Sequence, residues 1–166
     1  MSRFFSSKYH TLTPYTPGEQ PKDTQYLKLN TNESPYPPSP KAIELANYAA
    51  KNLHLYSDPE CRKLVEVASK KFNIEPEEII FTNGSDDVLN FAFMAFCDKN
   101  VKAVFPNITY GFYPVFAQLN NIEYNEIPLN EDFTINVDDY KNACATMFIA
   151  NPNAPTGIAL TLDQIE

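Results

Sequence analysis

A polar turn at residues 83–87 (NGSDD) follows the apolar segment 79–81 and precedes a long apolar segment that favours a helix. The glycine allows a sharp bend, and the N–H groups of a first helical turn, together with the helix dipole, attract anions. Ser85 adds a hydroxyl donor, so the turn suits a phosphate group. It equally suits a structural role, in which Ser85 caps the helix and the aspartates complement its dipole. The spacing matches neither a Walker loop nor a dinucleotide fingerprint, and taken alone it favours the structural role.

Two further polar turns follow the next apolar segments. The turn at 106–113 carries Tyr110, whose ring could stack on a flat heteroaromatic ligand or pack the loop against the domain. The turn at 151–157 holds two prolines and a glycine, which fix its backbone course. The carboxyl ends of parallel strands share one edge of a sheet, where open α/β proteins bind ligands. Three such turns therefore predict a ligand site at that edge.

The segments between these turns alternate between short apolar runs and helical patterns. They predict strands at 79–81, 101–105, 122–127 and 146–150, with helices over 85–97, 109–119 and 136–143. This alternation is typical of a parallel sheet with right-handed crossovers. Segment 88–97 is apolar nearly all round, which predicts a buried helix.

The N-terminal part has a different character. Residues 1–40 hold seven of the fourteen prolines and show only a short strand pattern at 26–29. We therefore expect an extended arm over 1–38 and the first part of a large α/β domain over 39–166.

Several positions in segment 39–166 carry residues that favour the start of a helix. Ser39 and Pro40 predict the start of a helix that runs to about Leu53. A second helix is expected over 59–72, packed through one apolar stripe. Residues 161–164 (TLDQ) form a capping box, the signal of a starting helix, yet the sequence stops at Glu166. We therefore expect the domain to be truncated at its C-terminus.

The composition narrows the class of protein. The chain has 166 residues and a net charge of −8, with 13 basic against 21 acidic side chains, which argues against a nucleic-acid partner. It lacks both the run of about 18–20 apolar residues that spans a membrane and an apolar signal core, so we expect a soluble cytoplasmic protein. Three cysteines without a Cys-x-x-Cys spacing suggest neither a disulfide framework nor a metal site. Cys97 and Cys144 are expected to be small buried residues.

Six segments, taken in order, resemble the histidinol-phosphate aminotransferases, which belong to the fold type I pyridoxal-phosphate enzymes related to aspartate aminotransferase. They are LTPY (12–15), LNTNESP (29–35), YSDP (56–59), NGSDD (83–87), TYGFY (109–113) and NPNAPTG (151–157). Each is weak alone, but together they cover nearly the whole chain at the family's spacing. The resemblance implies an N-terminal arm and the first half of a large three-layer α/β/α domain with a mostly parallel sheet.

The resemblance also implies the cofactor pyridoxal 5′-phosphate and the residues that bind it. Ser85 and Asp86 match the helix start that holds the cofactor phosphate, and Tyr110 matches a tyrosine that stacks on the pyridine ring. Tyr56 matches a tyrosine that reaches the cofactor phosphate of the other subunit. A homodimer with shared active sites follows from that match. Ala154 departs from the family, which commonly has an asparagine there that binds the cofactor's phenolic oxygen; Asn153, one residue away, receives no role.

The implied reaction is transamination of histidinol phosphate with 2-oxoglutarate, or the reverse with glutamate, in histidine biosynthesis. Tyr15 matches a residue that helps to hold the substrate phosphate, and Asn32 lies in a segment that lines the substrate side. The family's Schiff-base lysine, pyridinium-pairing aspartate and carboxylate-binding arginine match nothing here and are expected beyond Glu166. We therefore assign no catalytic residue within this chain and do not expect the chain alone to transaminate.

Alternatives share parts of this pattern. A threonine-phosphate decarboxylase or an aromatic aminotransferase would use the same cofactor-binding turns. A non-catalytic domain that binds a phosphorylated ligand, or serves as an interaction module, would fold as a compact monomer. Part of an aminotransferase would instead expose apolar sheet and helix surface.

Overall fold

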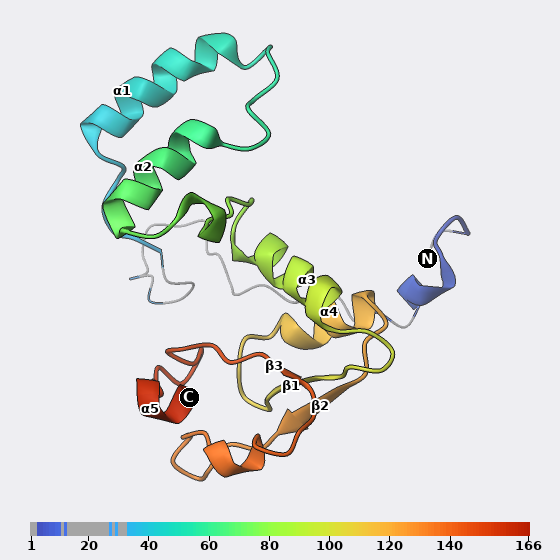
Figure 1. Cartoon of the computed structure of the whole chain (residues 1–166). Helices are drawn as coiled ribbons and strands as arrows, with labels where there is room; N and C mark the ends of the chain where they lie inside the picture. Colours follow the sequence, from blue (N-terminus) through green and yellow to red (C-terminus); the bar gives the residue numbers. More distant parts are fainter. Residues whose placement is uncertain (1–2, 11, 13–26, 28, 30–32) are drawn as a thin grey trace. The chain divides into compact units, whose positions relative to one another are not determined.

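The structure is a computed structural model that describes residues 3–10, 12, 27, 29 and 33–166 (Figure 1). The elements in chain order are η1 (Ser7–His10), α1 (Pro40–Ala49), η2 (Ala50–Asn52), α2 (Arg62–Phe72), η3 (Pro76–Glu78), α3 (Ser85–Phe96), β1 (Ala103–Pro106), α4 (Tyr113–Leu119), β2 (Tyr124–Ile127), η4 (Val137–Asp139), β3 (Thr146–Met147) and α5 (Leu162–Ile165). Two compact units divide the chain: Met1–Thr16 with Thr82–Glu166, and Pro17–Phe81. The expected arm over 1–38 and domain over 39–166 stay a prediction. Of the strand pattern at 26–29, only Leu27 and Leu29 are described, and both are exposed.

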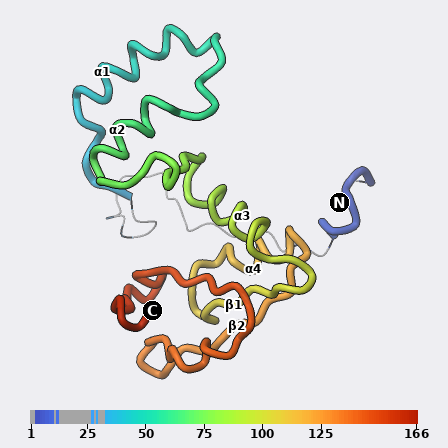
Figure 2. Tube along the Cα trace, in the orientation of Figure 1, coloured from blue at the N-terminus to red at the C-terminus, as the bar shows by residue number. Residues whose placement is uncertain are grey.

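The sheet lies in the unit that contains residues 82–166. Its strand order is β2-β1-β3, and both pairings are parallel, with Ala103 opposite Tyr124 on one side and Thr146 on the other. All four residues of β1 are buried, which is typical of a parallel strand covered on both faces. The trace in Figure 2 follows the crossover from β1 through α4 to β2. The predicted parallel α/β class is confirmed.

The core of this unit joins α3 and α4 to the sheet. Phe93 of α3 is completely buried, and its ring stacks on Phe148 with 3.9 Å between centroids and 6° between planes. The other buried members of the cluster are Cys97, Ala103, Phe105, Tyr113, Phe116, Ala117 and Ile122. Aromatic rings dominate, so this core is held by large contact areas rather than by aliphatic packing.

Several elements differ from the sequence-based expectation. Segment 79–81 is not a strand: Ile80 and Phe81 are exposed, and no strand of the described residues pairs with it. A strand needs a partner for its backbone groups, and apolar residues alone do not supply one. Helix α4 begins at Tyr113 because residues before it form a turn, and Pro114 is favoured in a first turn. The helix expected over 136–143 is only η4, and the strand expected over 146–150 is limited to β3.

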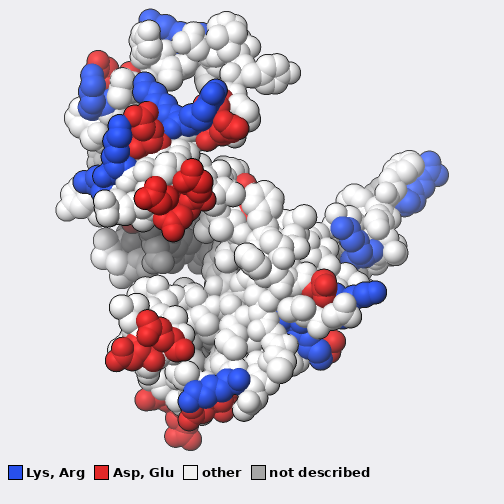
Figure 3. Space-filling model, in the orientation of Figure 1, with Lys and Arg blue, Asp and Glu red and all other residues white. Residues whose placement is uncertain are grey.

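Helix α3 is less buried than its composition predicts. Only Phe93 within it is buried, while Val88, Phe91, Met94 and Phe96 are between 38% and 65% exposed. The helix contacts the core through one side, and nothing among the described residues of its own unit covers the other. The face drawn in Figure 3 is largely uncharged over this helix. Exposed apolar helix surface is what the aminotransferase interpretation predicts.

The unit of residues 17–81 contains α1 and α2. The predicted start of α1 is confirmed, because Ser39 Oγ accepts a hydrogen bond from Ala42 N at 3.2 Å. Helix α2 begins at Arg62 rather than near residue 59, where Asp58 Oδ2 accepts from both Arg62 N and Arg62 Nε. This hydrogen bond to Arg62 lowers the pKa of Asp58. The stripe expected to pack α2 is not buried: Leu64 and Phe72 are exposed, and Val65 is half-buried.

The cysteines differ in burial. Cys97 is buried as predicted, and its burial raises the pKa of the thiol. Cys144 is exposed, so that prediction was wrong; it occupies a left-handed turn with φ of 42° before β3. Within the described ranges, no group of three or more His, Cys, Asp or Glu side chains is placed to hold a metal ion. No helix in those ranges is long and apolar enough to cross a membrane.

Tyr140 gives the fold a sensitivity to alkali. Its hydroxyl is buried without a hydrogen-bond partner among the described residues, and burial, with the charge of Asp139, raises its pKa from 10.0 to about 12. Because the folded state holds the proton more tightly, this group supports stability below about pH 10 and loses that contribution as the pH rises toward 12. We expect Tyr140→Phe to shift the midpoint of alkaline unfolding to higher pH, as followed by circular dichroism. Tyr36→Phe, at an exposed site, should leave the midpoint unchanged; equal midpoints for the wild type and Tyr140→Phe would contradict the prediction.

Candidate functional site

Gly84 and Ser85, at the start of α3, are exposed. Gly84 precedes the helix with φ of 81°, a conformation that favours glycine, and its carbonyl accepts from Thr82 Oγ1 at 2.7 Å. Within the described residues no side chain caps the helix at Gly84, and Ser85 is the first helical residue rather than the cap. The first N–H groups of an α-helix have no partner inside the helix. This geometry therefore favours the anion-binding role over the purely structural one.

The two acidic side chains of this first turn are held by protein donors. Asp86 Oδ1 accepts a hydrogen bond from the hydroxyl of Tyr110 at 2.6 Å. Asp87 Oδ2 accepts from Asn83 N at 3.1 Å, which fixes the turn ahead of the helix. Each of the two carboxylates therefore accepts a hydrogen bond from an identified group of the protein.

Asn153 ties the second turn to the third. Its side-chain oxygen accepts from Thr109 Oγ1 at 2.7 Å, and its side-chain nitrogen donates to the carbonyl of Ile108 at 2.9 Å. Its backbone N–H donates to Ile158 O, and its carbonyl accepts from Gly157 N. The residue is 2% exposed, so this amide is a buried connection between two loops.

These contacts bring the three turns together as predicted, although the first of them follows segment 79–81, which is not a strand. The bond from Tyr110 to Asp86 joins the turn after β1 to the start of α3, and the bond from Thr109 to Asn153 joins it to the turn after β3. We call the surface formed by residues 83–87, 106–113 and 151–157 the rim. The sequence did not identify Asn153; its position among two prolines and a glycine was the signal that could have singled it out.

Tyr110 combines the two roles that the sequence left open. The residue is half-buried. The centroid of its ring lies 5.9 Å from that of Phe112, with 23° between the ring planes, and 5.8 Å from that of Tyr113, with 76° between the planes. It therefore packs the loop against the core and keeps part of the ring accessible. Tyr56 is fully exposed and lies in the unit of residues 17–81. Tyr15 and Asn32 lie outside the described residues.

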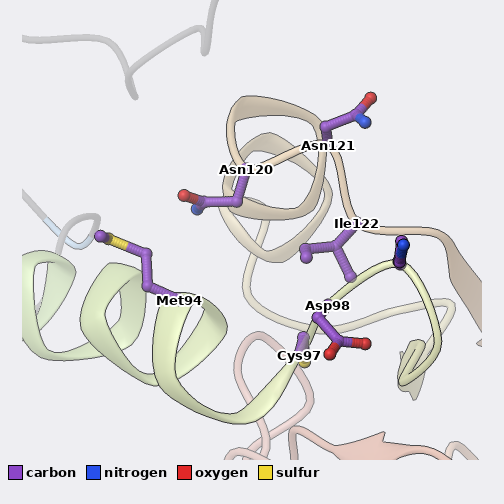
Figure 4. A pocket seen from close by; sticks show the side chains of 7 residues that line it. Met94, Cys97, Asp98, Asn120, Asn121 and Ile122 are labelled. Carbon is purple, nitrogen blue, oxygen red and sulfur yellow. The ribbon is translucent and has the colours of Figure 1, made fainter.

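A surface hollow of about 390 Å³ lies at the other end of α3 (Figure 4). Its lining comes from the ends of α3 and α4 and the segments after them: Met94, Cys97, Asp98, Lys99, Asn120, Asn121 and Ile122. None of the predicted site residues contributes to it. The hollow is separate from the rim.

The rim fits a ligand that combines a phosphate with a flat ring. The start of α3 offers N–H groups and the Ser85 hydroxyl, and Tyr110 offers an aromatic face tied to the same helix. Pyridoxal phosphate combines a phosphate with a flat ring, so it matches both features. The asparagine contact to its phenolic oxygen is not supplied by Ala154, and the Asn153 amide is occupied by Ile108 and Thr109.

Comparison with known proteins agrees with this assignment. Residues 24–166 match the family described as aminotransferase class I and II. The chain is 52% identical over 169 residues to a histidinol-phosphate aminotransferase of Brachyspira hyodysenteriae, and 50% identical over 167 residues to one of Gluconacetobacter diazotrophicus. Each alignment covers 100% of this chain and 47% of the relative, so the chain spans about half the length of these proteins.

A solved structure shows the same fold. The histidinol-phosphate aminotransferase from Sinorhizobium meliloti, in complex with pyridoxal-5′-phosphate, superposes with a TM-score of 0.73 at 20% identity. The match covers 81% of this chain and 38% of that one. With the family match over residues 24–166 and relatives at 50% and 52% identity, the chain belongs to the class I and II aminotransferase family.

Proposed function

We propose that this chain is the N-terminal part of a pyridoxal-phosphate-dependent aminotransferase that acts on histidinol phosphate, with 2-oxoglutarate and glutamate as the other pair. The observation that carries the proposal is the rim, where an uncapped helix start and an accessible tyrosine ring are joined by one hydrogen bond. The names of the relatives at 50% and 52% identity support the choice of substrate.

The residues of this chain bind and orient. The N–H groups of Ser85 and Asp86, with the Ser85 hydroxyl, hold the cofactor phosphate, where the helix dipole favours negative charge. Tyr110 lies against the pyridine ring and fixes its plane. When bound, the cofactor supplies an electron sink for the transfer of an amino group. The Schiff-base lysine that this chemistry needs belongs to the part of the protein beyond Glu166.

The remaining assignments concern the second subunit and the substrate. The protein works as a cytoplasmic homodimer, in which Tyr56 of each chain reaches the cofactor phosphate of its partner. The exposure of Tyr56 in a single chain supports this arrangement. Tyr15 contacts the phosphate group of the substrate, and Asn32 also contacts the substrate.

The test is turnover by the whole protein purified from its natural source. We expect it to transaminate histidinol phosphate with 2-oxoglutarate, with kcat/KM about 100-fold above that for phenylalanine, because a site built for a phosphate rejects substrates that lack one. Ser85→Ala in that protein should weaken cofactor binding about 10- to 100-fold, the usual range for loss of one hydrogen bond to a charged group. The outcomes that contradict the proposal are a preference for phenylalanine, release of CO₂ from threonine phosphate, and failure to bind pyridoxal phosphate.

A further inference from the structure

The hydrogen bond between Asp86 and Tyr110 is the shortest link in the rim that involves a charged group. At 2.6 Å it lies within the range of strong bonds from a hydroxyl to a carboxylate. The pair is partly buried and is separated by 24 positions in the sequence, so it connects two loops rather than neighbours within one. Such a bond fixes the far end of the tyrosine ring.

The rest of the ring is fixed by aromatic neighbours. Phe112 lies nearly parallel to Tyr110, with 23° between planes, and Tyr113 meets it edge-on at 76°. These contacts restrict how far the ring can tilt, but neither one restricts where its hydroxyl points. The carboxylate of Asp86 supplies that restraint, because it is the acceptor of the hydroxyl.

The neighbouring Asp87 shows that an acidic residue in the first turn of α3 need not bind a tyrosine hydroxyl. Asp87 also complements the dipole of α3, but its carboxylate accepts from the backbone N–H of Asn83. The helix dipole would favour either acid equally. A carboxylate is also a poor direct partner for a phosphate, since like charges repel. The specific feature of Asp86 is therefore its tyrosine partner.

We infer that the Asp86 side chain is a positioning residue, which holds the hydroxyl end of Tyr110 in place so that the ring can stack on a heteroaromatic ligand whose phosphate rests on α3. The inference rests on the proposed function, since it assumes that the rim binds a pyridine ring and a phosphate together. It assigns separate tasks to one residue: the N–H of Asp86 faces the phosphate, while its carboxylate orients a neighbour. Within the rim, the phosphate is then recognised by N–H groups and the Ser85 hydroxyl, and not by the Asp86 carboxylate.

The test uses the whole protein without its own cofactor, and 4′-deoxypyridoxine 5′-phosphate, which has the ring and the phosphate but no aldehyde to react with lysines. Binding is measured by titration of ring fluorescence, and ring orientation by the circular dichroism induced in the ring's absorption band. Asp86→Ala and Tyr110→Phe should each weaken binding about tenfold and reduce the induced signal. The double variant should bind about as well as either single one, because both changes remove the same bond.

Three controls separate orientation from folding and from charge. Asp86→Asn keeps an oxygen acceptor for the tyrosine hydroxyl and should restore binding to within about threefold of the wild type, with most of the induced signal. Asp87→Ala removes an acid from the same turn but keeps the bond from Tyr110 to Asp86, so it should reduce the induced signal less than Asp86→Ala does. Inorganic phosphate, used as a competitor, should bind Asp86→Ala at least as well as the wild type. Urea titration of each variant identifies any that fails to fold, and Tyr110→Phe and Asp86→Asn keep the volume of the side chain.

The outcomes distinguish the inference from the function on which it rests. Additive losses in the double variant, a full induced signal in Asp86→Ala, or an equal loss of affinity for inorganic phosphate would each overturn the positioning role. If the wild-type chain shows no saturable binding of the probe, the proposed cofactor site fails and the inference fails with it. If the wild type binds and Asp86→Ala is unchanged, only the inference fails.

Discussion

Replacing Asn153 by alanine is expected to lower the free energy of unfolding by about 2–4 kcal/mol, because the change removes a buried amide and both of its side-chain hydrogen bonds. The side chain is 2% exposed and bonds both the Thr109 hydroxyl and the Ile108 carbonyl. Because Asn153 is buried, water replaces these bonds less readily than it would at the surface. Urea unfolding, followed by far-ultraviolet circular dichroism, measures the difference.

Asn151 provides a matched control for this prediction. Its side chain also makes two hydrogen bonds, but both go to the backbone of Leu160 and lie at an exposed position. Water can replace those bonds, so Asn151→Ala should cost less than about 1 kcal/mol. Similar losses for the two variants would show that burial of the Asn153 amide does not determine its contribution.

The second large effect is expected at Phe93. Truncation to alanine removes a completely buried ring that stacks on Phe148. The centroid of this ring also lies 5.9 Å from that of Phe116. The substitution therefore leaves a cavity between α3 and the sheet. Such substitutions cost about 3–5 kcal/mol, from lost transfer free energy and from the cavity. In the same urea titration, the urea concentration at the midpoint of unfolding should fall strongly. If the chain is marginally stable, the variant should be unfolded even without urea.

Phe91 tests whether burial is the cause. It is the same residue type, two positions away in the same helix, but 49% exposed. Phe91→Ala should change the free energy of unfolding by less than about 1 kcal/mol, since alanine also favours the helix. If Phe91→Ala destabilised the chain as much as Phe93→Ala, the exposed face of α3 would have to be packed in solution.

The local signals in the sequence predicted the helices better than the strands. Ser39 and Pro40 marked the start of α1, and the capping box at Thr161 is formed with Gln164. Capping depends on residues three or four positions apart, so the sequence contains the whole signal. Segment 79–81 is as apolar as a strand, but strand formation depends on a partner far along the chain. That information is not in the local pattern.

The site was predicted in outline for a similar reason. Turn residues after apolar segments were enough to predict that 83–87, 106–113 and 151–157 lie together, although the first of them does not follow a strand of the sheet. The bonds that connect these turns, from Tyr110 to Asp86 and from Thr109 to Asn153, join residues 24 and 44 positions apart. Their partners become evident only when the turns are placed in space. Burial of the Asn153 amide likewise depends on tertiary packing, which composition does not specify.

The two bonds across the rim also have a thermodynamic consequence. They order three loops before any ligand arrives, so association does not have to order them. Immobilising a flexible side chain on binding costs about 0.5–1.5 kcal/mol, and this chain meets that cost for Tyr110, Asp86 and Asn153 when it folds. Folding stability and ligand affinity are therefore coupled at these residues: a substitution that loosens the rim weakens both, even where the altered side chain never touches the ligand.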